Sequence, residues 1–194
     1  MHDSFSRAYH FLRVITIALL CAGCTRSTIV NRETRPPRQS SSYQAGSQTA
    51  SSPATFDGRV VSIEDGDTII ILDDANRTYK IRLQGIDAPE GRQAFGDGSR
   101  QNLSDLVFEK QVQVESSKRD RYGRIVAKVV LDGDDICLQQ IKAGMAWHYK
   151  HYQGEQSAVD RELYATAEDE ARAKRLGLWR DDHPLPPWQF RRYH

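Results

Sequence analysis

Along the chain, short segments in which apolar residues alternate with polar ones or run together predict a set of β-strands. Asp65-Gly66 separates the first two, and this dipeptide is typical of a tight hairpin because both residues tolerate the positive backbone angles of such a turn. Five strands are expected, at residues 58–64, 68–72, 78–84, 112–115 and 124–131.

Apolar residues at helical spacing predict helices between and after these strands. The first helix carries Leu103 and Val107 on one face. The last carries Leu163, Ala167 and Ala171 at four-residue spacing, which favours a buried face formed by these three residues. The expected helices are 99–110, 135–143 and 158–176.

Five strands with a helix inserted after the third are typical of a small closed barrel of the OB type. The sequence therefore predicts a mainly β, α+β domain, in which a five-stranded OB-fold barrel is flanked by about three α-helices. Residues 184–188 (Pro-Leu-Pro-Pro-Trp) are expected to be extended.

The first residues of the chain have the pattern of an export signal. Arg7 and Arg13 precede the apolar run 14–21, which is far shorter than the roughly 20 residues that span a bilayer. Small residues then precede Cys24, as in a bacterial lipobox, where the chain is cut before a cysteine that becomes acylated. We expect a lipoprotein signal peptide at 1–23 and lipidation of Cys24; cleavage nearby and release is the alternative.

The segment 24–55 is expected to be a disordered tether, because its Ser, Thr and Pro residues cannot bury enough apolar surface to offset their ordering entropy. The folded domain is then 56–194. Cleavage before Cys24 would leave Cys137 as the one free thiol, between Ile136 and Leu138, where a small buried core residue is expected. We expect an exported monomer that faces the periplasm or the cell exterior and touches the membrane through its lipid anchor alone, or is otherwise secreted.

Composition argues against a generic polyanion-binding protein. The whole chain has a net charge of +1, and residues 56–194 carry 21 Lys and Arg against 24 Asp and Glu, a net charge of −3. Binding to nucleic acid would therefore depend on locally placed charge.

Two acidic clusters are candidates for a cation site. Asp65 and Asp67 flank the first hairpin turn, and residues 86–90 (Ile-Asp-Ala-Pro-Glu) follow the third strand. Carboxylates held together favour a hard cation such as Ca²⁺, which takes oxygen ligands. Residues 132–135 (Asp-Gly-Asp-Asp) repeat the acidic pattern and are expected to be only a turn and a helix cap, so the pattern alone is weak.

Three motifs in order make the assignment more specific: 65–68 (Asp-Gly-Asp-Thr), 82–90 (Arg-Leu-Gln-Gly-Ile-Asp-Ala-Pro-Glu) and 120–124 (Asp-Arg-Tyr-Gly-Arg). With them the sequence resembles the staphylococcal nuclease (thermonuclease) family, in particular bacterial lipoprotein-type members, over roughly 56–188. The family has the same OB barrel. The resemblance implies a Ca²⁺-dependent nuclease that hydrolyses phosphodiester bonds of DNA and RNA and leaves 3′-phosphates.

The resemblance also implies a metal site. Asp67 and Asp87 would bind Ca²⁺ through their carboxylates and Ala88 through its backbone carbonyl, so that Ala in place of the frequent Thr has no consequence there. Asp65 and Thr68 would stand behind these ligands and support them.

The catalytic roles implied by the resemblance fall on Arg82, Arg124 and Glu90, with Arg121 and Tyr122 contacting a nucleotide phosphate. The chemistry is consistent, since phosphodiester hydrolysis builds negative charge on phosphate oxygens. An arginine fork meets two such oxygens at once, and a carboxylate can align or deprotonate water. The alternative for both catalytic arginines is solvated charge on exposed strand faces.

Other candidates are weaker. The aromatic and basic segment 147–152 suits base stacking as well as core packing. His148 and His151 lack a further ligand motif for zinc. Arg191 and Arg192 could touch phosphates, but a frayed terminus is the expectation. A non-catalytic OB-type module that binds nucleic acid at the surface is the main alternative function, followed by a purely structural surface lipoprotein.

Overall fold

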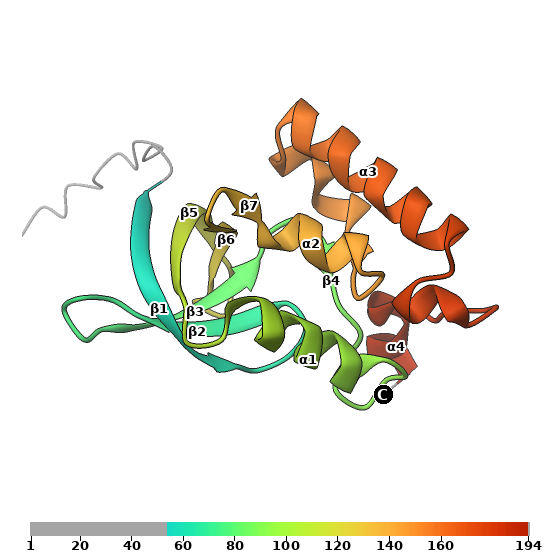
Figure 1. Ribbon diagram of the computed structural model, residues 1–194, viewed down its shortest axis with the longest axis horizontal. Helices are drawn as coiled ribbons and strands as arrows, with labels where there is room; N and C mark the ends of the chain where they lie inside the picture. Colours follow the sequence, from blue (N-terminus) through green and yellow to red (C-terminus); the bar gives the residue numbers. More distant parts are fainter. Residues whose placement is uncertain (1–53, 194) are drawn as a thin grey trace, which may run out of the picture. The chain divides into compact units, whose positions relative to one another are not determined.

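A closed barrel of five strands is the centre of residues 54–193, the part of the chain that the computed structural model describes (Figure 1). Antiparallel pairing joins β3 to β2, β2 to β1, β1 to β5 and β5 to β6, and parallel pairing of β3 with β6 closes the barrel. This confirms the predicted OB-type barrel. The barrel strands are β1 Thr55–Ile63, β2 Thr68–Leu72, β3 Thr78–Leu83, β5 Gln111–Arg119 and β6 Ile125–Leu131.

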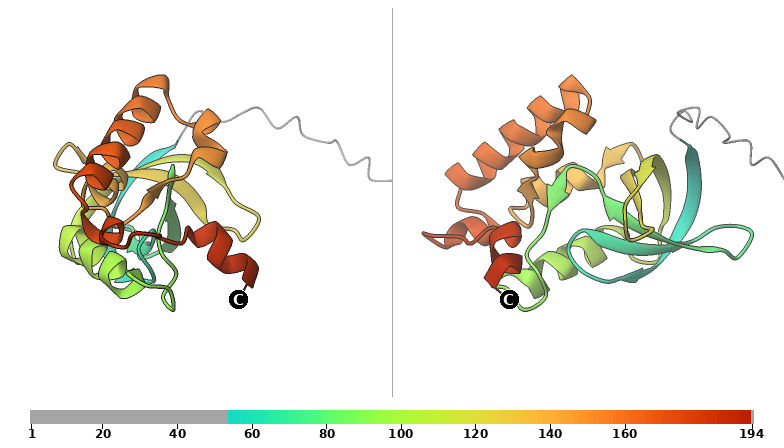
Figure 2. Two further views of the ribbon diagram at one scale, coloured as in Figure 1. Left: turned by 90° about the vertical axis from the view of Figure 1, so that its right-hand side faces the viewer. Right: turned by 180° about the vertical axis from the view of Figure 1, so that it is seen from behind.

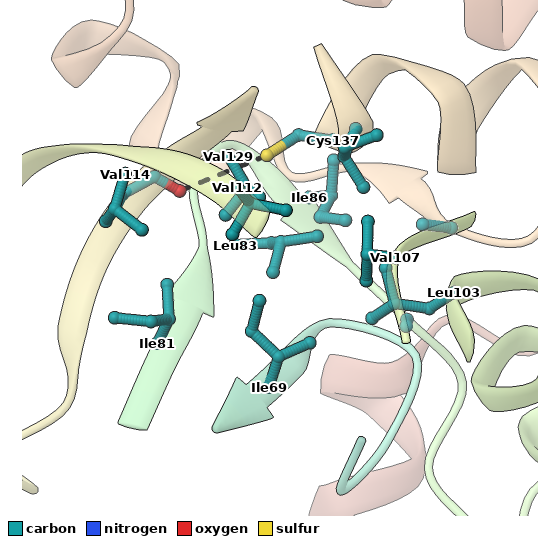
Figure 3. Packing of buried hydrophobic residues seen from close by; sticks show 14 of the residues in the cluster. Ile69, Ile81, Leu83, Ile86, Leu103, Val107, Val112, Val114, Val129 and Cys137 are labelled. Carbon is teal, nitrogen blue, oxygen red and sulfur yellow. Dashed lines mark hydrogen bonds between the residues drawn. The ribbon is translucent and has the colours of Figure 1, made fainter. Parts of the chain in front are cut away.

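The barrel closes around apolar side chains that alternate along its strands (Figure 3). Ile69 and Ile71 on β2 and Ile81 and Leu83 on β3 are fully buried, as the strand period of two requires. Cys137 is buried among them with its thiol near the Ala127 carbonyl, and burial raises its pKa well above the ordinary value. The expectation that Cys137 is a core residue is confirmed.

The helices gather at one end of the barrel in both the front and the rear view (Figures 1 and 2). Leu103 and Val107 of α1 are fully buried and complete the core at this end. The helices are α1 Gly96–Val107, α2 Ile136–Lys142, α3 Ala158–Ala173 and α4 Pro187–Tyr193, with 3-10 segments at Lys150–Glu155 and Gly177–Arg180. None of the helices in this part of the chain is long and apolar enough to cross a bilayer.

Two short pairings lie outside the barrel. β6 pairs with β7 (Asp134–Asp135), and β4 (Ile86–Asp87) pairs with β8 (Trp147–His148). The second pairing fixes the segment that carries Asp87 against the chain just before the 3-10 segment. Asp135 caps α2 by accepting a hydrogen bond from the Leu138 amide, so the 132–135 repeat is a turn and a cap as expected.

Several expected boundaries were wrong. Thr55, placed in the tether, is the first residue of β1 because it pairs with Glu115. The helix expected from Ser99 begins at Gly96, after Phe95 with a positive φ of 68°. It ends at Val107, and Glu109 beyond it has a positive φ of 63°. Residues 1–53, with the expected signal peptide, Cys24 and nearly all of the tether, lie outside the described residues.

The buried face of α3 also differs from the expected one. Leu163 is 48% exposed, whereas Tyr164 is buried and its hydroxyl donates to Asp135 at 2.7 Å. The first buried residue of α3 is therefore Tyr164 and not Leu163. Ala167 and Ala171 remain buried.

The C-terminal segment 184–188 is not extended throughout. Pro187 opens α4, because a proline at the first helical position needs no hydrogen bond for its nitrogen, and the Pro186 carbonyl accepts from the amides of Gln189 and Phe190. α4 thus ends the described chain, and in the left-hand view of Figure 2 it lies across the molecule from α1.

Candidate active site

Two loops carry the acidic residues, and the barrel brings them together. The Asp65 carboxylate accepts from the Asp67 amide at 2.9 Å, which tightens the turn between β1 and β2. Gly66 lies against the second loop so closely that a Cβ there would meet Ser99 Oγ at 1.8 Å and Ala88 Cβ at 2.8 Å. Only glycine allows this approach, and it sets the Asp67 backbone beside Ala88.

Asp67 and Asp87 face the same guanidinium nitrogen. Nη2 of Arg82 lies 3.0 Å from Oδ2 of Asp67 and 3.0 Å from Oδ1 of Asp87. The Ala88 amide donates to Oδ2 of Asp67 at 2.8 Å, and the Thr68 hydroxyl donates to Oδ1 at 3.1 Å. The two carboxylates therefore lie together at the Arg82 guanidinium, and Thr68 contacts Asp67.

Burial disfavours the charged form of the acidic pair. Burial raises the pKa of Asp67 to about 7, and the carboxylates of Asp65 and Asp87 act in the same direction against the opposing effect of Arg82. Bound positive charge would relieve this cost.

A hard divalent cation fits the donor set at this point. Asp67 and Asp87 supply carboxylate oxygens, and the Ala88 backbone could add a carbonyl oxygen next to them. In residues 54–193 no three His, Cys, Asp or Glu side chains gather at metal-ligand distance, so a cation here would take water or substrate oxygens as its further ligands.

Arg82 and Arg124 come from neighbouring strands and are held in different ways. Arg82 on β3 is only 14% exposed, and its Nη1 donates to the Leu83 carbonyl at 2.8 Å. Arg124 precedes β6, and its Nε donates to Asp120 at 2.7 Å. That contact leaves its two terminal nitrogens for other partners. The alternative of two solvated strand arginines is wrong.

Asp120 organises the turn between β5 and β6. Its carboxylate accepts from the Tyr122 amide, the Arg124 amide and the Arg124 guanidinium. Although burial alone would raise it, these hydrogen bonds hold the pKa of Asp120 below its ordinary value. The guanidinium of Arg121 packs over the exposed ring of Tyr122, 4.8 Å from its centroid.

One cleft of about 820 Å³ joins these parts. Of the ten residues singled out in the folded domain, Thr68 alone does not line it, and it contacts Asp67 from behind. The nine that line the cleft are Asp65, Asp67, Arg82, Asp87, Ala88, Glu90, Arg121, Tyr122 and Arg124.

The segment 147–152 contributes both to core packing and to the cleft. Trp147 is buried against Trp179, with ring centroids 4.4 Å apart, whereas Tyr149 and Tyr152 line the cleft. His148 is buried and bonds through Nε2 to Gln156 at 2.9 Å, while His151 is exposed. The two histidines therefore share no ligand position.

Sequence reasoning missed Arg191. The expectation that it lies on a frayed terminus is wrong, because α4 carries it to the cleft, where it forms ion pairs with Asp87 at 2.8 Å and Glu90 at 2.6 Å. The tryptophan in the preceding Pro-Pro-Trp segment was the available signal, since a large aromatic residue near a terminus favours anchoring.

The barrel and this cleft agree with the family that sequence comparison identifies. Residues 80–181 match the family model described as staphylococcal nuclease homologue. The chain belongs to the staphylococcal nuclease family, and this membership supports nuclease activity.

Similar curated proteins come from several bacteria. A Haemophilus influenzae protein named as an uncharacterized endonuclease is 45% identical over 134 residues, 69% of this chain and 72% of that protein. A Shigella flexneri protein named micrococcal nuclease is 45% identical over 149 residues, 72% of this chain and 82% of that protein. An uncharacterized endonuclease of Escherichia coli is 40% identical over 139 residues, 71% of this chain and 86% of that protein.

Proposed function

We propose that this chain is a Ca²⁺-dependent nuclease that hydrolyses the phosphodiester bonds of DNA and RNA. The observation that carries the proposal is that two buried carboxylates, Asp67 and Asp87, are brought together on the Arg82 guanidinium, in a cleft that Glu90 and Arg124 also line. Each of these side chains has a role in phosphodiester hydrolysis.

Asp67, Asp87 and the Ala88 carbonyl would hold the calcium ion, with Asp65 and Thr68 supporting Asp67. When bound, the ion supplies positive charge that attracts the substrate phosphate and offsets the repulsion between the two aspartates. Asp67 and Asp87 are both buried, and two neighbouring buried carboxylates are costly unless positive charge offsets theirs.

Arg82 and Arg124 stabilise the charge that develops on the phosphate oxygens. Asp120 holds Nε of Arg124, so both terminal nitrogens of Arg124 can face the phosphate. Leu83, Asp67 and Asp87 orient Arg82, whose Nε and second Nη1 N–H are not used by these contacts. Preorganised donors are effective because they do not have to reorient as the charge builds up.

Glu90 is the group proposed to align the attacking water or accept its proton. Its side chain is partly exposed at the cleft, so water can reach it, and its amide is fixed by a hydrogen bond to Gln93. Arg121 and Tyr122, on the turn between β5 and β6, are placed to contact a nucleotide phosphate outside the reacting bond. The proposed products end in a 3′-phosphate.

A cleavage assay tests this proposal. Purified protein is incubated with supercoiled DNA and with structured RNA, in Ca²⁺ and in excess EDTA, and the product ends are identified by their sensitivity to a 3′-phosphatase. We expect cleavage of both substrates with Ca²⁺, none with EDTA, and recovery when Ca²⁺ is restored. Full activity in EDTA would contradict the calcium role, and binding without cleavage would favour a non-catalytic module.

We also propose that the domain is exported as a monomer and anchored through an acylated Cys24. The support is the sequence alone, namely the short apolar run 14–21 followed by small residues before that cysteine. Mass spectrometry of the mature N-terminus tests this, because a diacylglyceryl-modified Cys24 at the N-terminus is expected. An unmodified N-terminus at another residue would show ordinary cleavage and release.

A further inference from the structure

The C-terminal helix places a third arginine on the acidic side of the cleft. Arg191 of α4 donates from Nη1 to Glu90 at 2.6 Å, from Nη2 to Oδ2 of Asp87 at 2.8 Å, and from Nη1 to Oδ1 of Asp87 at 3.2 Å. These partners lie 101 and 104 positions earlier in the chain. One guanidinium thus bridges a proposed calcium ligand and the proposed general base.

These contacts leave Asp87 with both carboxylate oxygens engaged. Oδ2 is bound by Arg191, and Oδ1 is shared between Arg191 and Arg82. Asp87 is 1% exposed, so another ligand has little room to approach from a different side. A cation that binds Asp87 must therefore displace at least one guanidinium.

Glu90 is held by the same side chain. The Glu90 oxygen that accepts from Arg191 is occupied by that contact and is not free to bind a water molecule. The Arg191 contact therefore opposes two functions at once, namely cation binding at Asp87 and the positioning of water at Glu90.

The two arginines that hold Asp87 differ in how firmly they are attached. Arg82 is on a central strand and has a further bond to the Leu83 carbonyl. Arg191 is in the last turn of the terminal helix and is 43% exposed, so its side chain can turn into solvent. Arg191 is the partner more easily displaced.

The backbone of this segment, by contrast, is well anchored. The Trp188 ring stacks on Tyr149 with centroids 5.5 Å apart and packs edge-on against Trp147 at 5.4 Å. The side chain of Gln93 donates to the Leu185 carbonyl. α4 therefore stays beside the cleft and keeps Arg191 within reach of the carboxylates.

We propose that α4 is an autoinhibitory latch in which Arg191 competes with the divalent cation for Asp87 and holds Glu90. The proposal rests on the calcium role proposed above. It assigns to the C-terminal helix the control of how tightly the site binds its cation.

Calcium titration by isothermal calorimetry, without nucleic acid, tests the latch on the purified protein. Arg191→Gln removes the charge and the fork, and we expect Ca²⁺ to bind about tenfold more tightly, because charge-assisted hydrogen bonds to a partly exposed group no longer have to be broken. Arg192→Gln is the matched control, since it removes the same charge from the adjacent, exposed position of the same helix. We expect its affinity to stay within about twofold of the wild type, an allowance for long-range, screened electrostatics.

Arg191→Lys keeps the positive charge but removes the planar guanidinium, so it separates the effect of one from that of the other. Lysine cannot bridge both carboxylates as the planar guanidinium does, so we expect an affinity between those of the wild type and Arg191→Gln. The rise in melting temperature on adding Ca²⁺ is a second measurement, and it should be larger for Arg191→Gln because tighter binding stabilises the folded state more.

The outcomes distinguish the latch from the calcium role. Unchanged or weaker Ca²⁺ binding in Arg191→Gln, with normal binding in the wild type, would overturn the latch and leave the proposed function standing. Equal tightening in Arg191→Gln and Arg192→Gln would overturn it too, since net charge would then be the cause. If neither the wild type nor Arg191→Gln binds Ca²⁺, both proposals fail, whereas binding by Arg191→Gln alone would support a tightly closed latch.

Discussion

Replacement of Arg82 by lysine gives the sharpest test of the proposed chemistry. The guanidinium makes three contacts, with the Leu83 carbonyl, Asp67 and Asp87, through two different nitrogens. The single nitrogen of lysine cannot satisfy both the carbonyl and the aspartates, and we expect it to stay with the two carboxylates.

The expected loss follows from these contacts. A lysine held by the aspartates offers no second donor to the phosphate, and removal of one such preorganised donor costs about 2.7–4 kcal/mol in the transition state, or about 10²–10³ in kcat. Since the charge is kept, the free energy of unfolding should fall by no more than about 1.5 kcal/mol, the value of one hydrogen bond. The same substitution at Arg124 should also lower kcat by about 10² or more.

The assay measures kcat and KM on a fluorescent oligonucleotide, with urea unfolding as the check on folding. Arg77→Lys is the matched control, because Arg77 also holds an aspartate, Asp73 at 2.7 Å, but does not line the cleft. Its kcat should equal that of the wild type. A kcat for Arg82→Lys within about threefold of the wild type would refute the assigned role.

Two further substitutions test positioning and packing. Asp120→Asn should lower kcat about tenfold with little change in unfolding free energy, because Arg124 loses a charged acceptor that orients it; an unchanged kcat would show that Arg124 is oriented without it. Tyr164→Phe should lower the unfolding free energy by about 1–2 kcal/mol in urea and leave kcat unchanged, because the lost hydrogen bond to Asp135 lies outside the cleft; a loss below about 0.5 kcal/mol would contradict this.

The barrel could be predicted because its strands and turns are specified by residues that are close together in the sequence. Residues such as Ile69, Ile71 and Ile81 alternate inward with the strand period, and a turn signal marks the first hairpin. Asp67 and Asp87 were singled out for another reason, namely the resemblance of three motifs to the staphylococcal nuclease family, since the acidic pattern alone is weak. Closure of the barrel then brings the two loops together.

Features set by tertiary contact could not be predicted in the same way. Helical spacing allows either Leu163, four residues before Ala167, or Tyr164, three residues before it, as the first buried residue of α3. Tyr164 is the one that bonds to Asp135, which belongs to a different element. The pairing of β4 with β8 is only two residues long and has no periodicity to detect. Such contacts become visible only once the barrel has formed.

Arg191 is a candidate functional residue whose position could not be predicted, because its contacts with Asp87 and Glu90 are tertiary. On the acidic side of the cleft, Arg82 pairs with Asp67 and Asp87, and Arg191 pairs with Asp87 and Glu90. Asp87 is the one carboxylate of this group that both guanidiniums hold. Displacement of Arg191 by the proposed cation would leave its guanidinium at the mouth of the cleft, where an incoming phosphate supplies the negative charge that it has lost. Arg191, which sequence reasoning set aside, is therefore the residue whose contacts with Asp87 and Glu90 link the resting cleft to the proposed binding of the cation.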